Sequence, residues 1–145
     1  MSVMQLKSIL CPIDFSDFSV AAYHHALSLA EYYKARMVAL HIVELWKYPF
    51  ADYAAQEADY AKFSRALNEG GQAQLQRFVR EHSLGRAEPD LVVHQGSAPK
   101  CILSIAQEEN ADVIVMGTHG RGDLTGLCWV QVLIVSYGRR HARCW

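Results

Sequence analysis

The chain has 145 residues, a length that is typical of a single domain. Hydrophobic residues make up 51% and charged residues 20%, a composition that supports a buried core and excludes intrinsic disorder. Fourteen basic residues against fifteen acidic ones give a net charge of -1, which argues against a dedicated nucleic-acid-binding protein.

Membrane, secretion and metal signals are also missing from the sequence. No apolar run approaches the ~18 residues of a membrane-spanning helix, and residues 1–7 lack the pattern of a signal peptide. The seven histidines have no spacing typical of metal ligands. The four cysteines form no CxxC pair and are too few for a disulfide scaffold. We therefore expect a reduced, cytoplasmic protein with no membrane segment and no metal site.

Strand and helix patterns alternate along the chain. Short apolar runs predict four strands, at residues 7–13, 37–43, 90–94 and 112–116. Helical periodicity and capping residues predict three helices, from Ser19 to about Ala35, from Glu57 to His82, and from the turn at Gly96–Pro99 to Asn110. This alternation predicts an α/β protein with an open parallel sheet and helices on both faces. Ligands of such folds bind beyond the carboxyl ends of the strands.

The residues that are best suited to bind a ligand follow two of the predicted strands. Asp14 follows the first strand, and the turn Gly117-Thr-His-Gly-Arg-Gly122 follows the fourth. Glycines let backbone N–H groups approach phosphate oxygens, and Asp14 can accept hydrogen bonds from adenine or ribose. The turn is equally compatible with simple strand termination, and Asp14 with capping of the next helix. We expect the first and fourth strands to be neighbours, because both carry these groups.

Four segments together resemble the universal stress protein family. They are Ile9-Leu-Cys-Pro-Ile-Asp-Phe-Ser16, Leu40-His-Ile-Val-Glu44, Gly96-Ser-Ala-Pro99 and Asp112-Val-Ile-Val-Met-Gly-Thr-His-Gly-Arg-Gly122. The resemblance covers residues 6–127 in the right order and spacing. It implies a Rossmann-like fold of the adenine nucleotide α-hydrolase type, with five strands in the order 3-2-1-4-5. It also implies a cytoplasmic homodimer that is linked to stress survival.

The resemblance also implies a nucleotide site, because one branch of the family binds ATP or AMP, with or without Mg, through G-x2-G-x9-G-[ST]. In this chain the implied site comprises Pro12, Asp14, Ile42, Met116, Gly117, Thr118, His119, Gly120, Arg121 and Gly122. Pro12 and Asp14 would border the adenine, and the backbone of Ile42 would contact its edge. Met116 and Gly117 would lie at the ribose, and the turn that follows would lie near the phosphates.

The end of the chain departs from the family pattern. Gly117 and Gly120 open the phosphate motif, but Val130 and Gln131 stand where a glycine and a serine or threonine should close it. We therefore divide the chain into a universal stress protein domain at residues 1–127 and an aberrant tail at 128–145, which replaces the last helix and strand. The β-branched segment from Val130 either joins the sheet directly or forms an exposed edge, so the fifth strand is in doubt.

The genetic code explains this departure. When the tail is translated one nucleotide earlier, Val130 becomes glycine without ambiguity and Gln131 permits serine. The same shift permits the sequence Cys-Pro-Val-Leu, which is typical of the family's last strand, at residues 142–145. We infer a frameshift near residues 122–127, in the gene or in its sequencing.

The sequence thus predicts an adenine-nucleotide-binding regulatory module whose phosphate clamp is lost, so that ATP binds weakly or not at all. Its partners would be the nucleotide and a second copy of the chain, with no nucleic acid and no membrane. A turnover enzyme is disfavoured beyond slow ATP hydrolysis, because the SGGxDS and HxGH motifs of related nucleotide-transfer folds are absent. A nucleotide-free interaction protein of the same fold is the alternative.

Overall fold

A single twisted sheet forms the centre of the molecule. The computed structural model describes residues 5–47, 57–86, 88–118, 129–134 and 143–144. In this part of the chain the sheet has the strand order β3-β2-β1-β4-β5-β6. The strands are β1 (Ser8–Pro12), β2 (Arg36–Val43), β3 (Asp90–Gln95), β4 (Val113–Thr118), β5 (Trp129–Ile134) and β6 (Arg143–Cys144). Strands β1 to β4 are parallel, and β1 lies between β2 and β4, which confirms the expected order 3-2-1-4-5.

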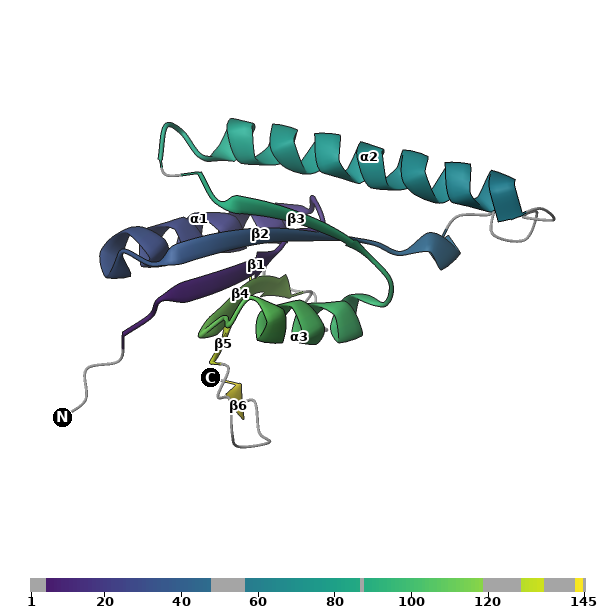
Figure 1. Ribbon diagram of the computed structural model, residues 1–145. Helices are drawn as coiled ribbons and strands as arrows, with labels where there is room; N and C mark the ends of the chain where they lie inside the picture. Colours follow the sequence, from purple (N-terminus) through teal and green to yellow (C-terminus); the bar gives the residue numbers. More distant parts are fainter. Residues whose placement is uncertain (1–4, 48–56, 87, 119–128, 135–142, 145) are drawn as a thin grey trace, which may run out of the picture.

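Helices cover both faces of this sheet, as the alternating pattern predicts. The helices are α1 (Asp17–Tyr33), α2 (Glu57–His82) and α3 (Ala98–Glu108), with a short 3-10 helix, η1 (Leu45–Lys47), after β2. Figure 1 shows α2 (teal, top) above the sheet and α3 (green) on the opposite side. Helices α1 and α2 share one hydrophobic cluster with the sheet, and α3 packs in a second one. None of the helices in the described ranges is both long and apolar enough to cross a membrane.

The central strand β1 is a continuous apolar run because it is buried on both faces of the sheet. Ile9 and Cys11 belong to the cluster beneath α1 and α2, whereas Leu10 belongs to the cluster beneath α3. All three side chains are fully buried. Successive side chains of a strand point to opposite faces, so a strand that is covered on both faces needs apolar residues at every position.

Helix α1 begins earlier than the sequence pattern suggests. The N-cap is Ser16, whose hydroxyl accepts a hydrogen bond from the N–H of Ser19 at 3.2 Å. The prediction of a helix that begins after Ser19 is therefore wrong by about one turn, because the Ser19 side chain is bonded to Asp14 instead of capping. The helix ends at Tyr33, and Lys34 adopts a left-handed conformation with φ of 52°.

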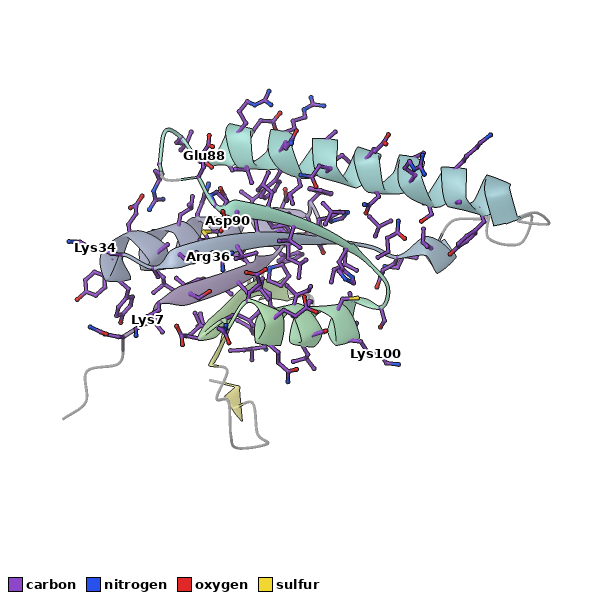
Figure 2. All side chains as sticks on the ribbon, in the orientation of Figure 1. Lys7, Lys34, Arg36, Glu88, Asp90 and Lys100 are labelled. Atoms are coloured by element: carbon purple, nitrogen blue, oxygen red, sulfur yellow. The ribbon has the colours of Figure 1, made fainter. Side chains whose placement is uncertain are left out.

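Charged groups join the elements at the amino ends of the strands. The Arg36 guanidinium at the start of β2 lies 2.7 Å from a carboxylate oxygen of Asp90 in β3 and 2.7 Å from one of Glu109 after α3. Figure 2 shows Arg36 and Asp90 close together at this end of the sheet. The Asp112 carboxylate accepts a hydrogen bond from the N–H of Ser8 at 3.0 Å. These polar contacts tie the amino ends of the strands to one another and to the residue after α3.

The fifth strand joins the sheet directly, which is one of the two outcomes that the sequence left open. It runs antiparallel to β4, with Val130 opposite Gly117 and Gln131 opposite Met116. Residues 119–128 connect the two strands, and this connection is shorter than the dozen or more residues that a parallel crossover needs. The position of the fifth strand beside β4 is therefore as expected, but its direction differs from the all-parallel sheet that the sequence pattern predicts.

Candidate functional site

A cleft of about 370 Å³ opens where β1, β2 and β4 end. Its lining comprises Pro12, Ile13, Asp14, Ser19, Leu40, His41, Ile42, Val43, Glu44, Lys47, Ala98, Ile102, Met116 and Gly117. The volume and the mixture of apolar walls with a few polar groups are typical of small-molecule sites. The cleft lies at the carboxyl edge of the parallel strands, where open α/β sheets bind ligands.

Half of the predicted site residues meet in this cleft. Pro12, Asp14, Ile42, Met116 and Gly117 all line it, although they come from three different strand ends. Thr118 is the last residue of β4. The remaining predicted residues, His119, Gly120, Arg121 and Gly122, lie outside the described residues.

Asp14 organises the start of α1 while it lines the cleft. Its Oδ1 atom accepts hydrogen bonds from the Ser16 N–H at 3.0 Å, the Ser16 hydroxyl at 2.5 Å and the Ser19 hydroxyl at 2.5 Å. Its own N–H donates to the Ser19 hydroxyl at 2.9 Å. A carboxylate that accepts several hydrogen bonds stabilises a tight turn. Asp14 thus does not cap α1, since Ser16 does, but it holds the capping serine in place.

The backbone next to Asp14 is held in an unusual conformation by aromatic packing. Phe15 has φ of 66°, a left-handed conformation that costs a non-glycine residue about 1–3 kcal/mol. Its ring lies 4.4 Å from the ring of His41 and 5.9 Å from that of Phe78, measured between centroids. His41 Nδ1 donates a hydrogen bond to the Ile13 carbonyl at 2.8 Å. The contacts of His41 are therefore structural, and they hold the turn that presents Asp14.

Gly117 brings the end of β4 into direct contact with α1. A Cβ atom at this position would lie 2.6 Å from backbone atoms of Phe18, so only glycine fits here without movement. This close approach draws the β4 end toward the turn at Asp14. The packing role of Gly117 is invisible in the sequence, which suggested only strand termination or a ligand contact.

Glu44 and Lys47 are two cleft residues that the sequence analysis missed. Glu44 follows β2, and its Oε1 accepts a hydrogen bond from the N–H of Ala98, in the first turn of α3, at 3.2 Å. Its Oε2 forms an ion pair with Lys47 of η1. The Lys47 ammonium, and the Ala98 N–H to a lesser degree, hold the pKa of the Glu44 carboxyl below its usual value although burial opposes this. Glu44 closes the matched segment that begins at Leu40, but no spacing rule marked it as functional.

Comparison with known proteins shows the family to which the chain belongs. Residues 5–134 match the model of the universal stress protein family. The chain belongs to the universal stress protein family.

This universal stress protein is similar in sequence and in fold to other members of the family. The chain is 31% identical over 134 residues to the universal stress protein MJ0531 of Methanocaldococcus jannaschii, and the match covers 92% of this chain and 74% of that protein. The solved structure of MJ0577 has a TM-score of 0.66 at 22% identity and covers 86% of this chain and 83% of that one. A universal stress protein that was crystallised in complex with cAMP has a TM-score of 0.51 at 17% identity, with 85% and 81% coverage. The structural likenesses show the shared Rossmann-like fold.

Proposed function

We propose that this chain is a regulatory module for stress survival that binds an adenine nucleotide, such as ATP or AMP, in the cleft at the carboxyl ends of β1, β2 and β4. The observation that carries the proposal is the convergence of Pro12, Asp14, Ile42, Met116 and Gly117 on one cleft of ligand size. A member of the family in complex with cAMP supports an adenine nucleotide as the ligand. Cytoplasmic location and a homodimeric family form belong to the same proposal.

The phosphate end of the ligand is bound weakly in this proposal. Val130 and Gln131 occupy the positions of the family's closing glycine and serine, and they pair with Gly117 and Met116 in the sheet. Opposed pairs in an antiparallel ladder alternate between hydrogen-bonded and non-hydrogen-bonded, so one of these two residues has its N–H and C=O bonded to β4 and unavailable to phosphate oxygens. Each charge-assisted hydrogen bond that is lost in this way costs about 1.5–3 kcal/mol.

Calorimetric titration of two chains tests the proposal. The first is the chain as given, and the second is the frame-restored chain, which carries the shifted translation from about residue 122. We expect AMP to bind both, and ATP to bind the frame-restored chain at least roughly 100-fold more tightly, with or without Mg²⁺, because about two phosphate hydrogen bonds are regained. Equal ATP affinities would contradict the loss of the clamp, and no binding of AMP to either chain would contradict the nucleotide site.

A nucleotide-free interaction protein is the second candidate function. The observation that favours it is that Val130 and Gln131, which stand in place of the family's closing glycine and serine, are paired with β4 in the sheet. Acid extraction of the purified protein, followed by chromatography of the released nucleotides, separates the two functions. Stoichiometric adenine nucleotide supports the nucleotide-binding module, and its absence together with failure in the titration supports the interaction protein.

A further inference from the structure

We propose that Glu44 is a specificity-determining residue of the cleft, which selects a base with an exocyclic amino group, such as adenine, over a base with a keto group at the same position. This inference rests on the proposed function, because it concerns the base end of the same nucleotide site. No motif in the sequence indicates it, and it depends on contacts between β2, η1 and α3.

The fold places Glu44 at the base end of the cleft. Glu44 directly follows β2, and β1 separates β2 from β4 in the sheet. Adjacent strands lie about 4.8 Å apart, so the end of β2 lies roughly 10 Å from the end of β4. The glycine turn that would hold the phosphates follows β4. A nucleotide with its phosphates at that turn therefore directs its base toward Ile42 and Glu44, which line the cleft at the β2 end.

The Glu44 carboxylate is held in place at this end of the cleft. One oxygen accepts from the Ala98 N–H at 3.2 Å, the other is paired with Lys47, and the side chain is 14% exposed. Two contacts from two different elements restrict its rotamers, so the acceptor is fixed before a ligand arrives. An ionised carboxylate has only acceptor sites, about four lone pairs on two oxygens, and these two contacts leave further acceptor capacity.

Acceptor chemistry distinguishes the two kinds of base. An amino group donates a charge-assisted hydrogen bond to a carboxylate. A keto group at the same position presents a second acceptor, so the two oxygens repel each other and the carboxylate loses solvent without compensation. Among the described lining residues, the carboxylates of Asp14 and Glu44 outnumber the one ammonium, that of Lys47, which also favours a donor on the ligand. A discrimination of roughly 10- to 100-fold follows from one such bond.

Adenosine and inosine are suitable probes for this inference, because they carry no phosphate and differ in this group and in the hydrogen on the neighbouring ring nitrogen N1, which accompanies the keto group in inosine. Calorimetric titration of the chain as given should show adenosine binding roughly 10- to 100-fold more tightly than inosine. In Glu44→Gln the amide oxygen can still accept from the Ala98 N–H while the amide N–H₂ donates to a keto group. We therefore expect Glu44→Gln to bind the two nucleosides about equally. Glu44→Asp keeps the charge and should retain a preference for adenosine at reduced affinity.

Glu81→Gln serves as the matched control. Glu81 is an exposed residue of α2, and its carboxylate pairs with Arg77 at 3.0 Å. No residue of α2 lines the cleft among the lining residues named above. This variant should keep the adenosine preference of the unchanged chain, and circular dichroism melting curves check that each variant is folded. Equal binding of adenosine and inosine by the unchanged chain, or a preserved preference in Glu44→Gln, overturns the role of Glu44 and leaves the proposed function standing. Binding of neither nucleoside to any variant overturns both this inference and the proposed function.

Discussion

At the scale of single residues, burial controls the chemistry of Cys11. Its thiol lies in the middle of β1 and is fully buried, and burial raises its pKa to about 12. The thiolate is the reactive form of cysteine, so Cys11 is inert in the folded protein.

This burial predicts a loss of stability at alkaline pH. In the unfolded chain the thiol ionises near pH 8.5, whereas in the folded protein it stays protonated to about pH 12. Because the pKa of Cys11 is raised in the folded protein, the stability that the protonated thiol contributes is fully present below pH 8.5 and is lost as the pH rises toward 12. Urea unfolding of the wild-type chain should lose about 1.4 kcal/mol per pH unit from this group within that window.

Cys11→Ala removes this titration. Its free energy of unfolding should be lower than that of the wild type at pH 7.5, because the core loses a sulfur atom, but it should fall less between pH 7.5 and 10. Burial raises the pKa of the Tyr23 hydroxyl as well, and the neighbouring Cys11 adds to this shift, so Cys11→Ala removes the thiol titration together with the small part of the Tyr23 shift that Cys11 causes. Parallel pH profiles for the two chains would show that burial of Cys11 is not linked to stability.

At the scale of elements, the contact between β4 and α1 depends on one glycine. Helix α1 packs across the sheet in the cluster that contains Val113 and Val115 of β4, and Gly117 lies beyond them against Phe18. The added Cβ would meet backbone atoms, which have no alternative rotamer. Either α1 or the end of β4 must therefore move when the residue is larger.

Gly117→Ala should destabilise the protein by about 1–3 kcal/mol, as overpacking of a close contact does. Gly70→Ala is the matched control, because nothing lies within 4 Å of a Cβ at this position of α2. The control should raise stability by about 0.5–1 kcal/mol, since alanine favours a helix more than glycine does. Thermal melts of both variants decide the matter, and a Gly117→Ala variant as stable as the control would exclude the close contact.

At the scale of the whole molecule, the edge of the sheet beyond β4 consists of the apolar strand β5 and the two-residue strand β6. Strand β5 is built from Trp129-Val-Gln-Val-Leu-Ile134, with no charge and no proline. Among the described residues, β6 pairs only with Leu133 and Ile134 of β5. Apolar strands with incompletely paired edges favour aggregation.

We expect the chain as given to be less soluble than the frame-restored chain and to form a weaker dimer. Size-exclusion chromatography with light scattering on both chains, at matched concentration and salt, measures the two properties. The frame-restored chain should elute as a dimer, and the chain as given should show monomer together with larger species. A stable, monodisperse dimer of the chain as given would mean that its tail is a working variant with its own interface.

The sequence by itself determined the elements and most of their order. Apolar runs and helical periodicity depend on local burial patterns, so the strands β1 to β4 and both ends of α2 follow from residues that are near each other in the chain. The family motifs also brought Pro12, Asp14, Ile42, Met116 and Gly117 to one predicted site, and these five residues line one cleft.

Only the tertiary structure decided the contacts between distant segments. The approach of Gly117 to Phe18 and the bond from Ala98 to Glu44 each join elements that are far apart in sequence, and the antiparallel direction of β5 depends on its packing beside β4. No residue pattern encodes such contacts, because they depend on how strands, helices and short connections pack together in space. The apolar and glycine positions of this cleft were therefore predictable, whereas its fixed carboxylate at Glu44 became visible only after α3 was placed against the end of β2.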